Sequence, residues 1–190
     1  GIRMSFLEPI PSVMEMTNYT LDELMKNYAI KGKEICPYRH NVRFDVIGIN
    51  RNKKEVRIFE VKSSRADFTS DKKWQSYLPF CTHFAFVAPK GVIKIEELPK
   101  GIGLVEFWYE EGTNCKDETY HYLTYQYTRR CSRLQKHPAE EYYVSLLEGF
   151  VMRLITEAEE FKYYWEMQKQ IKEIKYDILA ILKHFKVKTF

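Results

Sequence analysis

The segment of residues 43–74 constrains the fold of this chain more than any other part of the sequence. Residues 43–49 are mostly apolar and lack a helical period, which indicates a buried strand. Turn residues follow at 50–53, and residues 55–62 then alternate strictly between two faces. The segment therefore predicts two strands joined by a tight turn, a β-hairpin in which opposite side chains come close together.

Three charged side chains converge at the end of this predicted hairpin that lies away from the turn. Glu60 and Lys62 are one strand repeat apart and project from the same face as Val56 and Ile58. Pairing of the two strands around the turn brings Asp45 of the first strand next to Glu60. The pattern therefore predicts two neighbouring carboxylates and a lysine on one face of a sheet.

This trio suits the metal-assisted hydrolysis of a phosphodiester bond. A hard divalent cation with oxygen ligands relieves the repulsion between two adjacent carboxylates, polarises a phosphate oxygen and lowers the pKa of bound water. We expect Asp45, Glu60 and the backbone carbonyl of Val61 to bind Mg²⁺, with Mn²⁺ as a substitute. Lys62 beside the metal would orient the water or stabilise charge on phosphorus. The expected catalytic residues are Asp45, Glu60 and Lys62.

The acid-x-lysine pattern is a weak signal on its own, because it occurs four times in the chain. The four occurrences begin at Glu60, Asp71, Glu160 and Glu173. The last three lie in segments typical of helices, where residues i and i+2 point in different directions. Only Glu60 has an acidic partner across a predicted hairpin. The alternative interpretation is an ordinary solvated hairpin face, on which Glu60 and Lys62 are surface charges.

The motif and the residues around it resemble a known family. Asp45 followed by Glu60-Val61-Lys62 is similar to the PD-(D/E)XK signature of restriction-endonuclease-like nucleases, although Phe44 stands where the signature has its proline. The wider region, residues 40–107, resembles the MmcB-like DNA repair proteins. The matching segments are Arg43-Phe44-Asp45-Val46, EVKSSRADF at 60–68, Asp71, Lys73-Trp74, YLPFC at 77–81 and FAFVAP at 84–89. The resemblance implies a nuclease-like fold with its active site at Asp45, Glu60 and Lys62.

Further elements are expected after the hairpin. Residues 67–78 are expected to form one helix that ends at Pro79, and residues 82–88 to form a buried strand. Because strand, helix and strand follow in that order, a right-handed crossover lays the later strand parallel to the Glu60 strand. Two more strands are expected, at 103–109 and 120–128.

Ahead of the hairpin, Thr20 and Glu23 form the pattern of a capping box, which predicts a helix that begins there and ends at Gly32. Residues 33–38 are a candidate first strand. Together with the resemblance, these elements predict an α/β, restriction-endonuclease-like domain over residues 1–138. Its mixed central sheet would have four or five strands and would be flanked by helices.

Residues 139–190 are expected to form a helical C-terminal extension, because apolar residues recur there at steps of three and four. One unbroken helix over 139–184 would be about 69 Å long, whereas a compact domain of this size has a radius of gyration of about 16 Å. The segment therefore either folds back as a hairpin near 169–172 or buries its apolar stripe against a second copy. Because the sequence shows no clear turn, we expect a homodimer through this region.

Basic residues are concentrated near the motif and again beyond residue 128, although the net charge is only +4. Clustered cations suit a phosphate backbone, even though many charge runs are simply solvated. DNA is the expected partner. The expected nucleic-acid contacts are Ser63, Ser64, Arg65, Lys72 and Lys73 beside the motif and Arg129, Arg130 and Arg133 further along.

The four cysteines form no C-x-x-C pair and show no metal-ligand spacing, so we expect reduced thiols. A secretory signal and a membrane-length apolar run are both absent from the sequence, which predicts a cytoplasmic protein without a membrane partner.

These patterns together favour a Mg²⁺-dependent endodeoxyribonuclease in DNA repair, or in the DNA metabolism of a mobile element or phage. The substrate is left open between duplex, branched and single-stranded DNA, and RNA is also left open. The main alternative is a non-catalytic module that keeps the nuclease fold and binds nucleic acid or a repair partner.

Overall fold

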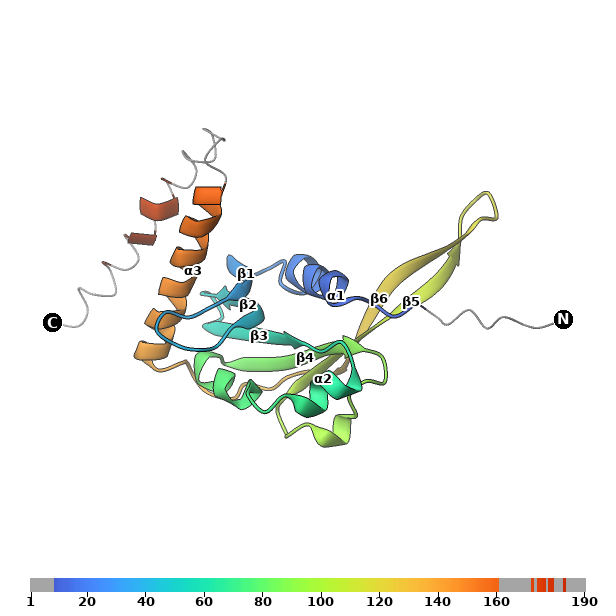
Figure 1. Ribbon diagram of the computed structural model, residues 1–190, viewed down its shortest axis with the longest axis horizontal. Helices are drawn as coiled ribbons and strands as arrows, with labels where there is room; N and C mark the ends of the chain where they lie inside the picture. Colours follow the sequence, from blue (N-terminus) through green and yellow to red (C-terminus); the bar gives the residue numbers. More distant parts are fainter. Residues whose placement is uncertain (1–8, 161–171, 173, 177, 180–182, 184–190) are drawn as a thin grey trace.

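A computed structural model describes residues 9–160, 172, 174–176, 178–179 and 183 (Figure 1). The helices are α1 (Val13–Tyr19), the π-helical turn η1 (Thr20–Leu24), α2 (Arg65–Ser70), the 3₁₀ helices η2 (Trp74–Phe80) and η3 (Ile95–Glu97), and α3 (Glu140–Glu160). The strands are β1 (Ile30–Ile35), β2 (Phe44–Asn50), β3 (Glu55–Val61), β4 (His83–Pro89), β5 (Gly103–Thr113) and β6 (Thr119–Arg129).

These six strands form one mixed sheet in the order β1-β2-β3-β4-β5-β6. Strands β3, β4 and β5 are parallel, and the remaining neighbours are antiparallel. The predicted α/β class, with a mixed central sheet, flanking helices and a C-terminal helix, is confirmed. The expected count of four or five strands is wrong, because β1 occupies one edge of the sheet and the tyrosine-rich β6 the other. Beyond the sheet, β5 and β6 continue as a two-stranded arm (Figure 1).

The predicted hairpin forms from β2 and β3, with Val46 opposite Phe59 and Ile47 opposite Ile58. Side chains alternate between the two faces as expected. Ile47 and Ile58 belong to one buried cluster, whereas Val46 and Phe59 belong to the other. The same register, continued by one residue, sets Asp45 opposite Glu60.

Each face of the sheet has its own apolar core. On one face, α1 and η1 pack Met16 and Met25 against Val46 and Phe59. On the other face, side chains of η2 and α3 close over the cluster that contains Ile47 and Ile58 (Figure 1). The three side chains that α3 contributes to this second core are Leu146, Leu147 and Phe150.

The single helix expected over 67–78 is wrong, because the chain leaves the helical conformation at Asp71. Helix α2 stops at Ser70, Asp71 is extended with φ −73° and ψ 112°, and η2 then runs through Pro79. The hydroxyl of Ser70 bonds the carbonyl of Asp67, which is a local alternative to helix propagation. The extended conformation turns the Asp71 carboxylate towards Lys62, 2.7 Å away.

The N-terminal helix also differs from its prediction. It begins about two turns earlier, at Val13, where Ser12 and Glu15 form the capping box. Thr20 has helical dihedral angles and lies inside the turn that continues α1, so it caps nothing. Gly32 lies within β1, where its missing side chain leaves room for Phe150 of α3. These residues show that a capping pattern occurs twice here and that packing on the sheet selects the earlier one.

The C-terminal region folds back on itself, which is one of the two arrangements that the sequence left open for residues 139–184. A small apolar cavity of about 80 Å³ is lined by residues of α3 together with residues of the later segment: Val151, Leu154, Ile155, Ile174, Lys175, Ile178 and Leu179. In one continuous helix Val151 and Ile174 would be about 34 Å apart. The turn expected near 169–172 falls largely outside the described residues.

The fold-back covers part of the apolar stripe with the chain itself, so a second copy would meet only the apolar side chains that stay exposed. Among the described residues, no helix combines the length and the hydropathy that crossing a membrane requires.

Candidate active site

The predicted catalytic residues meet where β3 ends and β2 begins. Asp45 and Glu60 border a pocket of about 360 Å³ that is lined by Cys36, His40, Asn41, Val42, Arg43, Asp45, Glu60, Lys73 and Tyr77. One wall is the connection between β1 and β2, and the other is the region of η2. We call Asp45, Glu60, Lys62 and Asp71 the acidic site.

Asp45 is anchored by the neighbouring strand. Its Oδ2 accepts a hydrogen bond of 2.8 Å from the backbone N–H of Val61. Burial raises the pKa of the Asp45 carboxyl, and the Val61 N–H and the Lys62 ammonium only partly offset this effect. Asp45 is thus fixed in position while its ionisation is disfavoured.

Glu60 has one occupied oxygen and one without a partner. Its side chain is almost fully buried, and Oε1 accepts a hydrogen bond of 2.9 Å from Lys62 Nζ. Oε2 is buried and has no hydrogen-bond partner among the described residues. Burial raises the pKa of Glu60 to about 8, the negative charge of Asp45 adds to this effect, and Lys62 opposes it. The pair of carboxyls therefore holds a proton near neutral pH.

Lys62 lies between two carboxylates and is only 5% exposed. Its Nζ is 2.9 Å from Glu60 Oε1 and 2.7 Å from Asp71 Oδ2. The Asp71 contact is short but poorly directed, so we treat it as an ion pair rather than a hydrogen bond. Burial acts to lower the pKa of Lys62, but Asp71 and Glu60 outweigh it and hold the pKa above its usual value. Lys62 is a permanently charged group in this setting.

Asp71 is the residue of the acidic site that the sequence analysis did not identify. Its acid-x-lysine pattern was assigned to a helix, whereas the carboxylate points at Lys62 and its Oδ1 accepts a 2.7 Å hydrogen bond from the backbone of Lys73. Burial acts to raise the pKa of Asp71, but Lys62 and the Lys73 N–H outweigh it, so the pKa is lowered. The signal that pointed to it was its presence among the segments that resemble the family.

Two features bear on whether the acidic site suits a divalent metal ion. The orphaned Oε2 of Glu60 beside Asp45 is a buried oxygen that lacks a cation, which fits a hard metal. Among the described residues, however, no three acidic, histidine or cysteine side chains are arranged around one point. A metal here would thus have two carboxylate ligands and would complete its shell with backbone oxygen and water, as Mg²⁺ commonly does.

The expected nucleic-acid residues next to the motif mostly have partners within the chain. Ser63 donates its backbone N–H and its hydroxyl to Asp67, and Ser64 caps α2. Arg65 forms a bidentate ion pair with Glu97. Lys72 and Lys73 are exposed, and Lys73 lines the pocket of the acidic site. The lysines are therefore better placed for a phosphate than the two serines.

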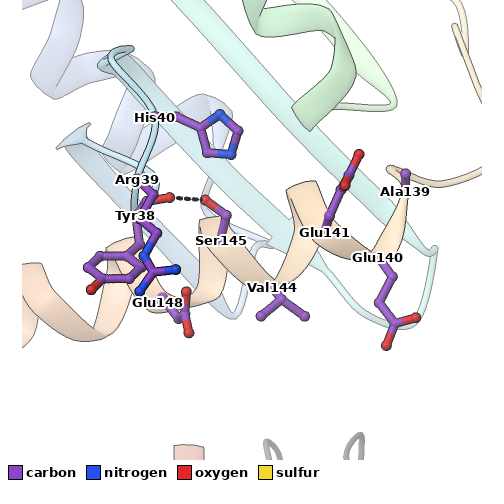
Figure 2. A pocket seen from close by; sticks show the side chains of 9 residues that line it. All are labelled: Tyr38, Arg39, His40, Ala139, Glu140, Glu141, Val144, Ser145 and Glu148. Atoms are coloured by element: carbon purple, nitrogen blue, oxygen red, sulfur yellow. Dashed lines mark hydrogen bonds between the residues drawn. The ribbon is translucent and has the colours of Figure 1, made fainter. Parts of the chain in front are cut away.

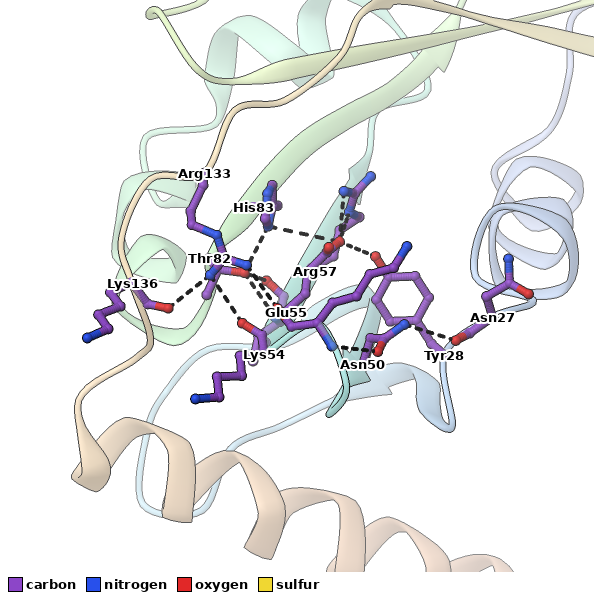
Figure 3. Close-up of polar contacts among 12 residues, drawn as sticks. Asn27, Tyr28, Asn50, Lys54, Glu55, Arg57, Thr82, His83, Arg133 and Lys136 are labelled. Carbon is purple, nitrogen blue, oxygen red and sulfur yellow. Dashed lines mark hydrogen bonds and ion pairs between the residues drawn. The ribbon is translucent and has the colours of Figure 1, made fainter.

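The other expected nucleic-acid residues lie elsewhere. Arg129 donates to the carbonyls of Leu98, Pro99 and Ile102, and Arg130 stacks over the ring of Tyr127. Arg133 donates to the carbonyls of Lys53, Lys54 and Lys136, at the turn between β2 and β3 (Figure 3). That turn is about 20 Å from Glu60, because β3 rises about 3.3 Å per residue. These arginines hold backbone segments together at a distance from the acidic site.

A larger hollow of about 970 Å³ lies beside the acidic site rather than in it (Figure 2). It separates the β1–β2 connection from α3 and includes His40, which also lines the acidic-site pocket. Ser145 Oγ donates to the Tyr38 carbonyl at 2.6 Å, and the Tyr38 N–H donates to the Ser145 carbonyl at 2.9 Å. Helix α3 thereby holds the connection that forms one wall of the acidic site.

Comparison with known proteins adds a family and a fold. Residues 22–136 match a family model named MmcB-like, whose description is DNA repair protein MmcB-like. A solved structure of a protein of unknown function from Silicibacter pomeroyi is similar with a TM-score of 0.58 at 24% sequence identity, covering 83% of this chain and 94% of that one. No curated protein matches the chain significantly. The structural likeness supports the fold alone.

Proposed function

The chain belongs to the MmcB-like DNA repair protein family, and from this premise we propose that it is a Mg²⁺-dependent endodeoxyribonuclease of the PD-(D/E)XK type. The observation that carries the proposal is the buried carboxyl pair of Asp45 and Glu60, in which Glu60 Oε2 has no hydrogen-bond partner in the described part of the chain and a charged lysine lies 2.9 Å from Oε1. A purely structural ion pair would satisfy its oxygens. The cellular setting that we propose is DNA repair, and the DNA metabolism of a mobile element or phage is the variant of that setting.

Each residue of the acidic site has a separate task in this proposal. Asp45, Glu60 and the Val61 carbonyl would hold Mg²⁺, which supplies polarisation of the phosphate and activation of water. Lys62 donates to the negative charge that develops on the phosphate oxygens. Asp71 would hold the Lys62 ammonium in place, and keep its pKa raised, when the Glu60 side chain turns away from Lys62.

The pocket around the acidic site suits a phosphate. Arg43 and Lys73 line it and carry positive charge at its mouth. Tyr77 also lines it, and burial together with the charge of Glu60 raises the pKa of Tyr77 to about 12, so its hydroxyl stays protonated as a donor. Arg43, Lys73, Tyr77 and the metal ion would together bind a phosphate group that the carboxylates alone would repel.

The proposal is tested by metal binding and cleavage in parallel. Calorimetry with Mg²⁺ and Mn²⁺ should show binding to the parent protein and none to Asp45→Asn, and a panel of duplex, branched and single-stranded DNA should be cleaved by the parent protein. An RNA panel of the same shapes tests the choice of DNA. Equal metal binding by the parent protein and by Asp45→Asn would show that the acidic site does not bind the metal.

One observation favours a second function. Because only two carboxylates converge on the candidate metal position, a module that keeps the fold and binds nucleic acid or a repair partner without cleaving it is the alternative. The parent protein would then bind DNA in the presence of Mn²⁺ and leave every substrate of the panel intact.

A homodimer through the C-terminal helical region is a further part of the proposal. Met152, Ile174 and Leu179 are about half exposed there, and a second copy would cover them. Light scattering should give about twice the 22.8 kDa of one chain. A single-chain mass at micromolar concentration would rule this dimer out.

A further inference from the structure

Five cations gather at the turn between β2 and β3, at the far end of β3 from the acidic site. We call them the turn-end patch: Arg51, Lys53, Lys54, Arg133 and Lys136, all of which are exposed. Without these five charges, the formal net charge of +4 would be −1. The charge of this one patch thus exceeds the net charge of the whole chain.

The turn-end patch is a built structure rather than a mobile run of lysines. Arg133 donates to the carbonyls of Lys53 and Lys54 at 3.1 Å and of Lys136 at 2.9 Å, so it joins the turn to the segment after β6 (Figure 3). The Asn50 side chain accepts from the Lys53 N–H at 3.1 Å and closes the turn. The backbone positions that carry the lysines are thus held together, which lowers the entropic cost of binding a polyanion.

The surface between these cations is hollow. A pocket of about 540 Å³ is lined by Ile49, Asn50, Arg51, Lys54, Glu55, Val56, Lys136, His137 and Tyr143. The single carboxylate in its lining, Glu55, does not neutralise the patch, because it is already bound by Arg57 and by the hydroxyl of Tyr28. Arg51, Lys54 and Lys136 line the pocket, and arginine and lysine side chains are the donors that commonly bind phosphate groups.

A path without negative charge joins the turn-end patch to the acidic site. Residues 72–95 and residues 119–139 contain no aspartate or glutamate. The two segments meet where Gln135 donates to the carbonyls of Leu78 and Cys81, directly after η2. Along this path Lys72, Lys73, Gln75 and Ser76 are exposed on the side of the acidic site, followed by Lys136.

Two surfaces away from this path carry more acidic than basic residues. Helix α3 carries Glu140, Glu141 and Glu148 around the large hollow (Figure 2). The β5–β6 arm carries more acids than bases, namely Glu110, Glu111, Asp117 and Glu118 against Lys116. A phosphate backbone that starts at the acidic site is therefore repelled by α3 and the arm and attracted along η2.

We infer that the turn-end patch is a second anchor for the DNA backbone, reached from the acidic site along the exposed side of η2. The inference rests on the proposed function. The separation of about 20 Å along β3 corresponds to about six base pairs at 3.4 Å each. A duplex held at the acidic site would thus contact the patch about half a helical turn away, and the patch would set the direction in which the DNA leaves the site.

The test compares two triple variants of equal charge. The first replaces Lys53, Lys54 and Lys136 by glutamine. The control replaces three exposed lysines elsewhere, Lys26, Lys100 and Lys116, by glutamine. Fluorescence anisotropy with a labelled 20-base-pair duplex, in the presence of Ca²⁺, measures the affinity over a series of salt concentrations for each protein.

The patch variant should bind more weakly, and its slope of log affinity against log salt should fall by about 2.7, near 0.9 for each lost contact. The control should keep the parent slope. Equal slopes for the patch variant and the parent would overturn the inference, and so would an equal loss in the control, because that result would report net charge alone.

Two further outcomes separate this inference from the proposed function. If the parent protein binds no DNA at all, the proposed function fails. If the parent protein binds DNA and the patch variant binds equally well, only the second anchor fails. In a cleavage assay the patch variant should raise KM several-fold and leave kcat unchanged, because the patch lies far from the reacting phosphate.

Discussion

The two ends of strand β3 each hold a buried glutamate, and the two glutamates behave in opposite ways. Glu55 at the turn end is 8% exposed and Glu60 at the other end is 6% exposed. Burial acts to raise the pKa of Glu55, but its bonds to Tyr28 and Arg57 outweigh burial and the pKa is lowered. Burial and Asp45 raise the pKa of Glu60 to about 8. Two glutamates of one strand with similarly small exposed fractions thus have pKa values shifted in opposite directions.

The difference lies in the partners. Glu55 Oε1 accepts from Arg57 at 2.7 and 2.8 Å and from Tyr28, and no other carboxylate lies near it among the groups that affect its pKa. Glu60 faces Asp45 and shares Lys62 with Asp71, so three acids compete for one cation. A fully paired carboxylate stabilises a fold, whereas an underpaired one is available for a metal ion. Four experiments test this contrast.

The largest effect is expected on catalysis. Lys62→Met should lower kcat for DNA cleavage by about a thousandfold and leave DNA affinity within a few-fold, because Lys62 acts on charge that develops in the transition state. Arg57→Met at the other end of β3 is the matched control. Per folded molecule it should keep its activity, and a comparable loss in both variants would erase the distinction between the two ends.

A smaller effect is expected on stability as a function of pH. Because the folded pKa of Glu60 is raised from 4.5 to about 8, its contribution is fully present below pH 4.5 and is lost as the pH rises through 8. Without metal, the free energy of unfolding should fall by about 3 kcal/mol between pH 5 and 8, at 1.36 kcal/mol per unit.

The control for this pH effect is Glu60→Gln, measured by urea denaturation in EDTA. Burial lowers the pKa of His83, a group that gains stability as the pH rises, so the parent curve combines two trends. The difference between parent and variant isolates Glu60. A difference that does not change between pH 5 and 8 would contradict the raised pKa.

The two glutamates should respond oppositely to neutralisation at pH 7. Glu55→Gln should lower the free energy of unfolding by about 2 kcal/mol, because Arg57 is left without its counterion. Glu60→Gln should raise the free energy of unfolding by about 1 kcal/mol in the metal-free protein, because it removes a carboxyl whose ionisation burial and Asp45 disfavour. Thermal unfolding with EDTA measures both, and two changes of the same sign would contradict the comparison.

The smallest effect is expected from Asp71. Asp71→Asn should weaken Mg²⁺ binding about tenfold, or about 1.4 kcal/mol, since Lys62 then has only Glu60 as a partner and competes with the metal. In a Lys62→Met background the same substitution should change the affinity little. Calorimetry on the four proteins of this double-mutant cycle gives the coupling, and additive effects would show that Asp71 does not act through Lys62.

The hairpin and its charged residues were predictable from the sequence because they depend on local rules. A period of two fixes which side chains of β3 share a face, and the turn at 50–53 fixes the register that brings Asp45 to Glu60. The parallel pairing of β3 with β4 followed from the order of the elements. These features need no knowledge of distant partners.

The features that were missed depend on distant partners. Asp71 leaves the helical conformation to face Lys62, nine residues earlier, and helix propensity contains no such contact. Arg129 and Arg133 donate to carbonyls of other loops, and these contacts also join residues far apart in the chain. The charge of these residues follows from the residue types, whereas the groups that come within reach of them depend on the fold. The role of all these residues towards DNA stays a prediction.

Helix α3 and the loop that walls the acidic site touch so closely that neither can change alone. A methyl group at Gly149 would lie 2.3 Å from the carbonyl oxygen of Cys36, which is much closer than a non-bonded carbon atom approaches an oxygen. The loop begins at that residue and reaches the acidic-site pocket through His40. A larger residue at 149 therefore requires a new path for the loop, and an exchange of this helix with that of a relative has to bring a matching loop. The two segments, more than a hundred residues apart in the chain, are expected to evolve as one unit.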